Sequence, residues 1–321
     1  MKPIKVEPLE MELPSAYADR LGLLYTESVE TSHKKDLGQY FTPSQVASFM
    51  AGFATANKDL INILDPGCGI GILACSLVEH IVEKYPKVRE INLTTFEIDE
   101  NVLPYTDLAL SYLQSWARSK NVYVRHFLCK NDFILHNAKI LDDITTQEQY
   151  DIIITNPPYF KIPKNDVRAT AVKKLINGQS NIYSIFLIVA AKLLNSHGQL
   201  IFITPRSFAS GEYFRVFRNN FFSLMHIKHI HLFDSRKQLF GRDNVLQENI
   251  IVHAYRKSGD VRQLLILSEE LDAVQVSSST SADDLEEINV KIYKLSDIVD
   301  LQSAHKTLHI PFTSRDNSVM D

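Results

Sequence analysis

The stretch Tyr150-Asp-Ile-Ile-Ile-Thr-Asn-Pro-Pro-Tyr-Phe160 decides the fold that this sequence predicts. Residues 151–155 form a short run rich in isoleucine, which is typical of a strand buried on both faces of a parallel sheet. Two prolines then fix φ twice and remove two backbone donors, so neither strand nor helix continues. The sequence therefore predicts a stiff turn at the carboxyl end of a buried strand, where open α/β sheets bind their ligands.

The side chains of this turn suit a planar group that bears an amine. Asn156 supplies an amide, the prolines free backbone carbonyls from competing N–H groups, and Tyr159 supplies an aromatic face. A rigid turn that merely ends a strand is the alternative, and Pro-Pro alone would favour it. We prefer a binding site because of the motifs that lie upstream.

Composition limits the class of protein. A chain of 321 residues suits one large domain, or one domain with an appendage. The net charge of −4 gives no overall basic surface for nucleic acid, so contacts with a polyanion must come from local patches. Cys68, Cys75 and Cys129 have no metal-like spacing and cannot all pair, which predicts reduced thiols. With no signal peptide visible and no apolar stretch long enough to span a bilayer, we expect a cytoplasmic protein.

A glycine-rich turn follows an earlier strand. The strand covers 61–65, the turn is Pro66-Gly-Cys-Gly-Ile-Gly71, and a helix is predicted from about residue 72 to 84. This order is that of nucleotide-type cofactor sites, in which glycines let the backbone approach the ligand. The pattern D-x-G-x-G-x-G favours a ligand with a charged amino-acid end over a phosphate, and Asp65 could accept from an ammonium. A simple tight turn is the alternative.

Acidic residues end the next two strands. Glu97, at the tip of the strand that begins at Ile91, could accept both hydroxyls of a ribose. Asp99 is the better candidate for capping the helix predicted over about 100–120. After a strand over 122–128, Asp132 could accept from an adenine amino group and Phe133 could pack on its ring; alternatively, Asp132 only ends the strand.

The segment 34–43 precedes an amphipathic helix that begins at Ser44. A polar turn that bears Thr42 would lie at the N-terminus of this helix, where backbone N–H groups attract anions. Ordinary capping of the helix by Thr42 or Ser44 is equally consistent with the pattern.

Basic side chains follow the organising turn. Lys161, Lys164 and Arg168 lie in a segment whose acid is Asp166, and Arg206 follows a later predicted strand over 199–204. These cations could contact a phosphate backbone, or they could belong to a solvated loop.

The later part of the chain predicts a buried helix over 181–195 and two strands, 226–233 and 249–255, that could pair antiparallel. Phe240 between those strands is either a second stacking ring or a core residue. We predict no metal site, because the histidines of 226–231 have no carboxylate or cysteine in register. Strands are also predicted over 261–268 and 288–293, and 276–287 is predicted to be a linker or surface loop.

The motifs in this order resemble a known family. LGQYFTP, DPGCGIG, FEID, NDF, NPPY and ITPRSF, spread over about 35–255, look like S-adenosylmethionine-dependent amino-methyltransferases in the gamma arrangement. The nearest family is the N6-adenine-specific DNA methyltransferases of restriction–modification systems. The resemblance implies a Rossmann-like α/β fold with a mostly parallel seven-stranded sheet, an antiparallel last strand and helices on both faces. It also implies a catalytic domain over 35–257, with an N-terminal arm and short helix over 1–34 and a C-terminal extension over 258–321.

The same resemblance implies a role for each motif residue. The residues implied to bind S-adenosylmethionine are Tyr40, Thr42, Asp65, Pro66, Gly67, Gly69, Glu97, Ile98, Asp132, Phe133 and Asn156. Those implied to be catalytic are Asn156, Pro157, Pro158 and Tyr159, with Tyr159 and Phe240 stacking on the target base. Lys161, Lys164, Arg168 and Arg206 are the candidates for DNA phosphates.

The chemistry suits these residue types. The N6 lone pair of adenine is delocalised into the ring, so two acceptors that hold both N6 hydrogens would favour a pyramidal, nucleophilic nitrogen. The Asn156 side-chain oxygen and the Pro157 carbonyl can be those acceptors. The base must leave the duplex, and stacking on Tyr159 would offset part of that cost. No covalent intermediate on the protein is required.

One departure from the family concerns target recognition. Few residues follow Tyr255, and they are not basic, so most of a target-recognition region is expected to be missing. Either a partner chain supplies recognition of DNA or the sequence is a fragment. Other amino-methyltransferases with NPPY, which act on a protein glutamine or an RNA guanine, and a non-catalytic cofactor-binding subunit stay as alternatives. The upstream GQYFTP favours DNA.

Overall fold

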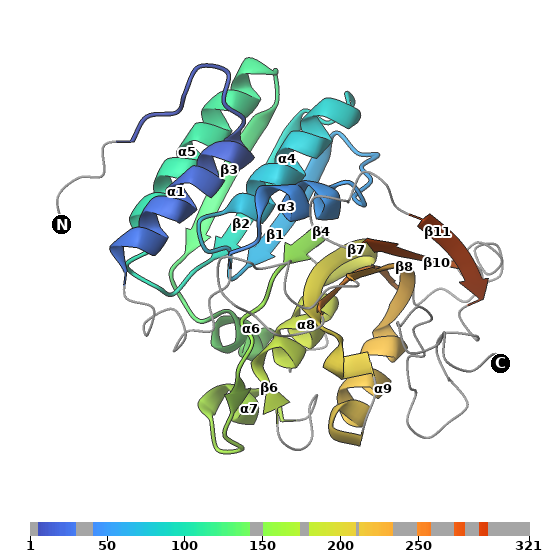
Figure 1. Cartoon of the computed structure of the whole chain (residues 1–321). Coiled ribbons are helices and arrows are strands. Elements are labelled where there is room, and N and C mark those ends of the chain that lie inside the picture. Colours follow the sequence, from blue (N-terminus) through green and yellow to red (C-terminus); the bar gives the residue numbers. More distant parts are fainter. Residues whose placement is uncertain are drawn as a thin grey trace, which may run out of the picture.

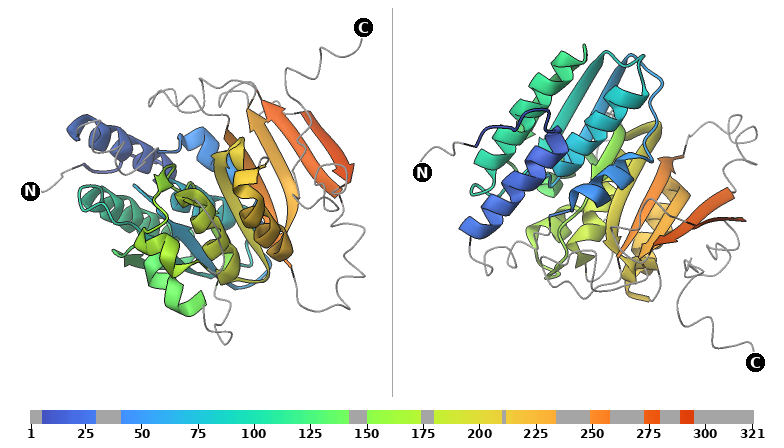
Figure 2. Two further views of the ribbon diagram at one scale, coloured as in Figure 1. Left: turned by 90° about the horizontal axis from the view of Figure 1, so that it is seen from below. Right: turned by 45° about the horizontal axis from the view of Figure 1, so that its top comes forward.

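A single sheet organises the computed structural model, which describes residues 6–29, 41–141, 150–173, 180–209, 212–233, 249–257, 273–279 and 289–294. Within these residues nine strands form the sheet in the order β11-β10-β8-β9-β7-β4-β1-β2-β3. Helices cover both of its faces (Figure 1). The two further views show the same layered arrangement (Figure 2).

The strands of the large sheet are mostly parallel. They are β1 (Leu60–Pro66), β2 (Glu90–Phe96), β3 (Tyr123–Cys129), β4 (Tyr150–Thr155), β7 (Leu194–Pro205), β8 (Met225–Phe233), β9 (Asn249–Arg256), β10 (Ala273–Ser279) and β11 (Asn289–Lys294). β9 runs antiparallel to both of its neighbours, β7 and β8, and β11 runs antiparallel to β10. A separate antiparallel pair consists of β5 (Lys161–Ile162) and β6 (Ser180–Asn181).

Helices divide between the two faces (Figure 1). On one face lie α1 (Pro14–Ser28), α3 (Ser44–Ala51), α4 (Ile72–Lys84) and α5 (Leu103–Ser119). On the other lie α6 (Phe133–Leu141), α8 (Ile182–Leu193) and α9 (Arg215–Leu224), while the short α7 (Val167–Ala171) lies beside α6. Two 3₁₀ turns cover Arg206–Ala209 and Glu212–Phe214. None of the helices described here combines the length and the apolarity that crossing a membrane would need.

The isoleucine run of β4 explains why the sheet has two apolar faces. Ile152 and Ile154 belong to the core beneath α3, α4 and α5, whereas Ile153 belongs to the core beneath α8. Successive side chains of a strand point to opposite faces, so each isoleucine is fully buried in one core or the other. This confirms the prediction of a strand buried on both sides.

The predicted architecture is confirmed for seven strands, and the sheet then continues further than predicted. The strands β3-β2-β1-β4-β7-β9-β8 form the mostly parallel sheet, and β9, last in the chain among these seven, is the antiparallel one. The prediction of a linker over 276–287 is wrong for 276–279, which belong to β10 and pair in parallel with β8. The predicted strand over 261–268 lies outside the described residues. The division into three domains stays a prediction.

Candidate active site

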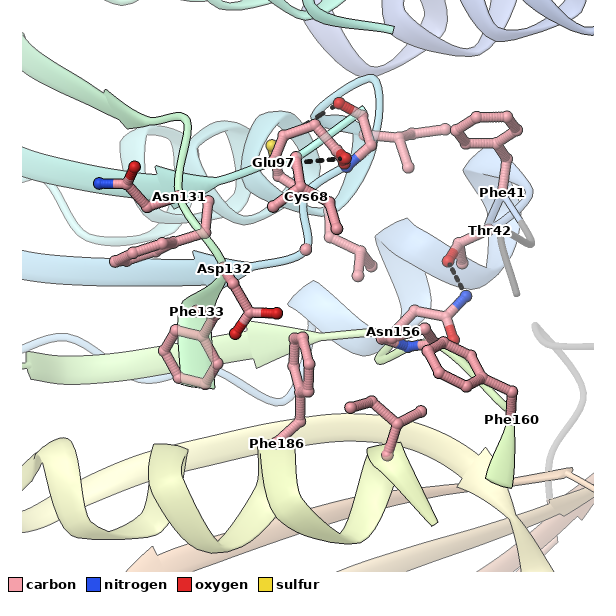
Figure 3. Close-up of a pocket in the computed structure, with 18 of the residues that line it drawn as sticks. Phe41, Thr42, Cys68, Glu97, Asn131, Asp132, Phe133, Asn156, Phe160 and Phe186 are labelled. Atoms are coloured by element: carbon pink, nitrogen blue, oxygen red, sulfur yellow. Dashed lines mark hydrogen bonds between the residues drawn. The ribbon is translucent and has the colours of Figure 1, made fainter. Parts of the chain in front are cut away.

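The NPPY turn, residues 156–159, follows β4 and touches the end of β1. Thr155, the last residue of β4, donates from Oγ1 to the Pro66 carbonyl, 3.0 Å away. The Asn156 carboxamide donates from Nδ2 to Thr42 Oγ1 at 3.1 Å (Figure 3). The NPPY turn and the glycine turn after β1 therefore lie side by side at one edge of the sheet.

The glycine turn, residues 66–71, requires glycine at more than one position. Gly67, Gly69 and Gly71 have φ values of +74°, +54° and +91°, a region that other residues enter only at a cost. A Cβ added to Gly69 would also lie 2.9 Å from Cε1 of Phe41. The turn therefore packs directly against the segment that carries Thr42.

Glu97 follows β2 and faces the glycine turn. Its Oε2 accepts from the Gly69 amide at 2.9 Å, and its Oε1 accepts from the amides of Ile98 and Asp99, both at 2.8 Å. Burial raises the pKa of Glu97, and these three amides oppose that shift. A carboxylate oxygen has two lone pairs, so Oε2 can still accept from a ligand hydroxyl.

Asp132 caps a helix and also borders the pocket, while its predicted contact with an adenine amino group stays a prediction. Its Oδ1 accepts from the Leu135 amide at 2.9 Å and so caps the start of α6. Its Oδ2 faces the guanidinium of Arg168 at 3.9 Å and borders the pocket described next. Phe133 is buried, and its ring lies 5.1 Å from that of Phe186 and 5.2 Å from that of Phe96.

A pocket of about 310 Å³ lies where these turns meet (Figure 3). The predicted site residues that line it are Thr42, Gly67, Gly69, Glu97, Ile98, Asp132, Phe133, Asn156, Pro158 and Arg168. Acidic groups thus lie on one side of an aromatic cavity, and the Asn156 amide lies across from them (Figure 3).

Other predicted site residues lie next to this pocket without lining it. Asp65, Pro66 and Pro157 belong to the buried strand end and turn behind it. Neither carboxylate oxygen of Asp65 makes a hydrogen bond within the described residues. Burial, with a smaller contribution from the Glu97 carboxylate, raises the pKa of Asp65 to about 8, and the nearby Ala74 amide opposes this shift. The predicted contact of Asp65 with an ammonium stays a prediction. Tyr40 and Phe240 lie outside the described residues.

Tyr159 is half-buried and is not one of the residues that line the pocket. Its hydroxyl donates to Asn156 Oδ1 and lies 3.0 Å from the Ile203 carbonyl. Its ring meets that of Tyr183 edge-on, with 6.3 Å between centroids. In this conformation the Asn156 oxygen already has a donor from within the turn.

The four basic candidates separate into two groups. Arg168 lines the main pocket, where Asp166 holds it through two hydrogen bonds and its guanidinium lies over the Phe160 ring. Lys161 and Lys164 are exposed and line a smaller hollow with Tyr213. Arg206 begins a 3₁₀ turn after β7 and is partly exposed.

Sequence reasoning missed most of the aromatic lining. Phe41, Phe96, Phe160 and Phe186 all border the pocket. Phe41 and Phe160 adjoin motif residues, which was a usable signal. Phe186 belongs to α8, whose side chains are apolar all round and so gave no sign of which face lines a cavity.

Cys68 also borders the pocket, inside the glycine turn. Burial is the main cause that raises the pKa of its thiol well above the usual value, and the nearby carboxylates of Asp65 and Glu97 add to the shift. A thiol held in its neutral form is a poor nucleophile.

Comparison with known proteins agrees with this geometry. Residues 86–240 match the model of the Eco57I restriction-modification methylase family. This matched segment holds the ends of β2 and β3, the NPPY turn and α8, and thus most of the residues that line the pocket.

Two relatives share sequence well beyond this segment. The Type II methyltransferase M.BsuBI of Bacillus subtilis is 31% identical over 89% of this chain and 55% of its own length. The Type II methyltransferase M.PstI of Providencia stuartii is 32% identical over 88% of this chain and 53% of its own. The chain thus spans about half the length of these relatives.

Solved structures show the fold. A Listeria monocytogenes protein assigned to the class I S-adenosylmethionine-dependent methyltransferases superposes with a TM-score of 0.62 at 16% identity, covering 88% of this chain and 81% of that one. The type IIG restriction endonuclease BpuSI superposes with a TM-score of 0.59 at 16% identity, over 88% of this chain and 34% of its own. The fold is therefore that of the class I methyltransferases, as the sequence predicted.

Proposed function

We propose that this chain transfers a methyl group from S-adenosylmethionine to the N6 amino group of adenine in DNA, as part of a restriction–modification system. One observation carries the proposal. The Asn156 carboxamide borders the same pocket as the Glu97 and Asp132 carboxylates, because the NPPY turn and the glycine turn share one edge of the sheet. The proposed amine acceptor would thus lie beside the proposed cofactor cavity.

The residues present fit the cofactor. Glu97 Oε2 would accept from the ribose hydroxyls, and Asp132 Oδ2 would accept from the adenine amino group. Phe133 and Phe186 give that end of the cavity apolar walls. The bare backbone of Gly67 and Gly69 would pass beneath the methionine end. When bound, S-adenosylmethionine supplies an electrophilic methyl group on its sulfonium.

Asn156 would act on the target base. Its Oδ1 and the Pro157 carbonyl would accept the two N6 hydrogens and hold the nitrogen pyramidal, with its lone pair directed at the methyl carbon. The backbone that carries both acceptors would be restricted before the base arrives, since Pro157 and Pro158 fix φ in the turn. Removing one such preorganised partner typically raises a barrier by about 3 kcal/mol.

Tyr159 would stack on the flipped adenine. Its ring is half-buried now, and its hydroxyl is held by Asn156 and Ile203. Stacking would therefore require the side chain to leave these partners. The favourable contact with the base would offset this loss together with part of the cost of unstacking the duplex.

Phosphate contacts are proposed for Lys161, Lys164 and Arg206, which lie near the NPPY turn and reach solvent. Arg168 is a weaker candidate for such a contact than the sequence predicted, because Asp166 neutralises it at the pocket. Since the whole chain is acidic overall, we propose that recognition of a DNA sequence uses a further protein surface, supplied by another segment or a partner chain.

The test is transfer of labelled methyl groups from S-adenosylmethionine to unmethylated DNA, RNA and protein, with the modified nucleosides identified after digestion. We expect label in DNA as N6-methyladenine, and its loss in Asn156→Ala with cofactor affinity nearly unchanged. Label in N4-methylcytosine, in RNA or in protein glutamine would overturn the choice of substrate. Loss of cofactor binding in Asn156→Ala would remove Asn156 from the role of base acceptor.

A further inference from the structure

The hydrogen bond between Thr42 and Asn156 assigns a task to Thr42 that its motif did not predict. The sequence expected Thr42 near the anionic end of the cofactor. In the structure its Oγ1 accepts from Asn156 Nδ2 at 3.1 Å, and Thr42 is 3% exposed (Figure 3). The contact joins residues 114 positions apart in the chain.

The two ends of a carboxamide have nearly the same shape and opposite hydrogen-bonding character. Oδ1 only accepts and Nδ2 only donates. A target amine donates, so the reaction needs Oδ1 of Asn156 on the side of the base. If the carboxamide turned by 180°, Nδ2 would meet the entering amine donor to donor. Some neighbouring group must select the useful orientation.

Thr42 is well placed to make that selection because both of its neighbours are anchored. Phe41, before it, packs on Gly69 and meets the Tyr25 ring edge-on. Pro43, after it, leads into α3, whose Ala47 amide bonds back to the Pro43 carbonyl at 2.9 Å. The hydroxyl acceptor therefore has a fixed position beside the NPPY turn.

The other end of the carboxamide agrees with this orientation. The Tyr159 hydroxyl donates to Asn156 Oδ1, yet it also lies 3.0 Å from the Ile203 carbonyl. A tyrosine hydroxyl has one proton to share between these two acceptors. Tyr159 can therefore release Oδ1 of Asn156 to an N–H of an entering amine.

We propose that Thr42 is a positioning residue: by accepting from Asn156 Nδ2, its hydroxyl keeps Asn156 Oδ1 directed at the target amine. The inference rests on the proposed role of Asn156. Positioning of Asn156 can be distinguished from the cofactor contact that the motif implies for Thr42, because loss of the first should lower kcat and loss of the second should weaken cofactor binding.

Two substitutions of Thr42 separate these roles. Thr42→Val keeps the shape and removes the acceptor, while Thr42→Ser keeps the acceptor. We expect Thr42→Val to lower kcat for methyl transfer about tenfold and to leave the cofactor dissociation constant within about twofold by calorimetry. Thr42→Ser should restore kcat. An unchanged kcat in Thr42→Val, or weaker cofactor binding that accounts for the loss, would overturn the proposal.

A second background makes the test sharper. Asn156→Asp offers an acceptor at both ends of the side chain, so the orientation no longer matters. We expect Thr42→Val to lose most of its effect on kcat in this background. An equal loss in both backgrounds would mean that Thr42 acts elsewhere. If Asn156→Asp transfers no methyl group, the difference in kcat between Thr42→Val and Thr42→Ser tests the proposal by itself.

An NMR measurement that needs no methyl transfer tests this inference independently of the proposed function. In the cofactor-free chain the Asn156 side-chain NH₂ resonances should shift, and exchange with water faster, in Thr42→Val but not in Thr42→Ser. Unmoved resonances would overturn the inference even in an active enzyme. If the wild-type chain gives no methyladenine while these resonances respond as expected, the proposed function fails and the contact remains.

Discussion

Acidification should destabilise the fold through three buried histidines that lie beneath α3, and the size of the loss can be calculated. His229, His231 and His253, from β8 and β9, form a histidine layer under Phe49 of α3 and under Phe53, two residues beyond the end of that helix. Phe53 stacks on His253 with 5.9 Å between ring centroids, and Phe49 meets His231 at 4.6 Å. Burial, with smaller contributions from the nearby His229 and Lys228, lowers the pKa of His253 from 6.5 to about 3.

The sign of the pH effect follows from which state binds the proton. Below pH 6.5 the unfolded chain protonates this ring, while the folded chain does not until about pH 3. The stability that His253 contributes is therefore complete above pH 6.5 and is lost as the pH falls toward 3. Between pH 7 and pH 5 the loss should be about 2 kcal/mol for this one ring.

Urea unfolding at pH 7 and pH 5 measures this loss in wild type and in His253→Phe, which keeps an aromatic ring against Phe53. Carboxylates with raised pKa values, such as Asp65 and Glu97, are common to both proteins and cancel in the comparison. Wild type should lose about 2 kcal/mol more than the variant. His197→Asn, at an exposed site, is the control and should behave as wild type. Equal losses in wild type and His253→Phe would refute the reasoning.

Two further predictions concern the pocket. Gly69→Ala should destabilise the fold by about 2–4 kcal/mol, since it combines a positive φ with a Cβ 2.9 Å from Phe41. Gly67→Ala should destabilise it by only about 1–2 kcal/mol, since its added Cβ would lie at an ordinary 3.5 Å from the nearest atom. Equal urea midpoints for the two variants would contradict this prediction. Glu97→Gln should weaken cofactor binding about tenfold by calorimetry and reduce stability by about 1–3 kcal/mol, because its new NH₂ would face a backbone amide donor. An unchanged dissociation constant would remove Glu97 from the ribose.

The sequence predicted the centre of the sheet well because local pattern and tertiary environment agree there. Strand β4 is a run of isoleucines that needs two apolar cores, and the structure provides both. The helix predicted over about 72–84 is observed as α4, Ile72–Lys84. Its start is marked by Gly71, whose left-handed conformation at the helix cap is one that glycine favours.

The edge beyond β8 was mispredicted for a physical reason. Serines near position 277 suggested a linker, yet Ser277 is fully buried in β10. It bonds to His229 at 2.7 Å and to His231 at 2.8 Å. A polar strand is stable there because its partners on β8 are also polar. Such matching across strands cannot be read from either segment by itself.

The motifs predicted which residues would lie at the ends of the strands, but they did not predict the side-chain conformations found there. The sequence placed Asn156 and Glu97 each at the carboxyl end of a predicted strand, where open α/β sheets bind their ligands. It carried no information on side-chain torsions, so it could not predict that the Tyr159 hydroxyl would bond to Asn156. The occupied oxygen of Asn156 is a property of the folded turn, which an entering base must change.

Helix α3 explains how the late strands affect the early motif. It has eight residues, too few to be stable alone in water, so packing sets its position. Phe49 of the helix meets the His231 ring at 4.6 Å, Phe53 just beyond the helix lies 4.5 Å from the His229 ring, and Thr42, two residues ahead of the helix, accepts from Asn156. We therefore expect changes in β8 and β9 to reach the Asn156 amide through this short helix, although β8 and β9 come after the NPPY turn in the chain.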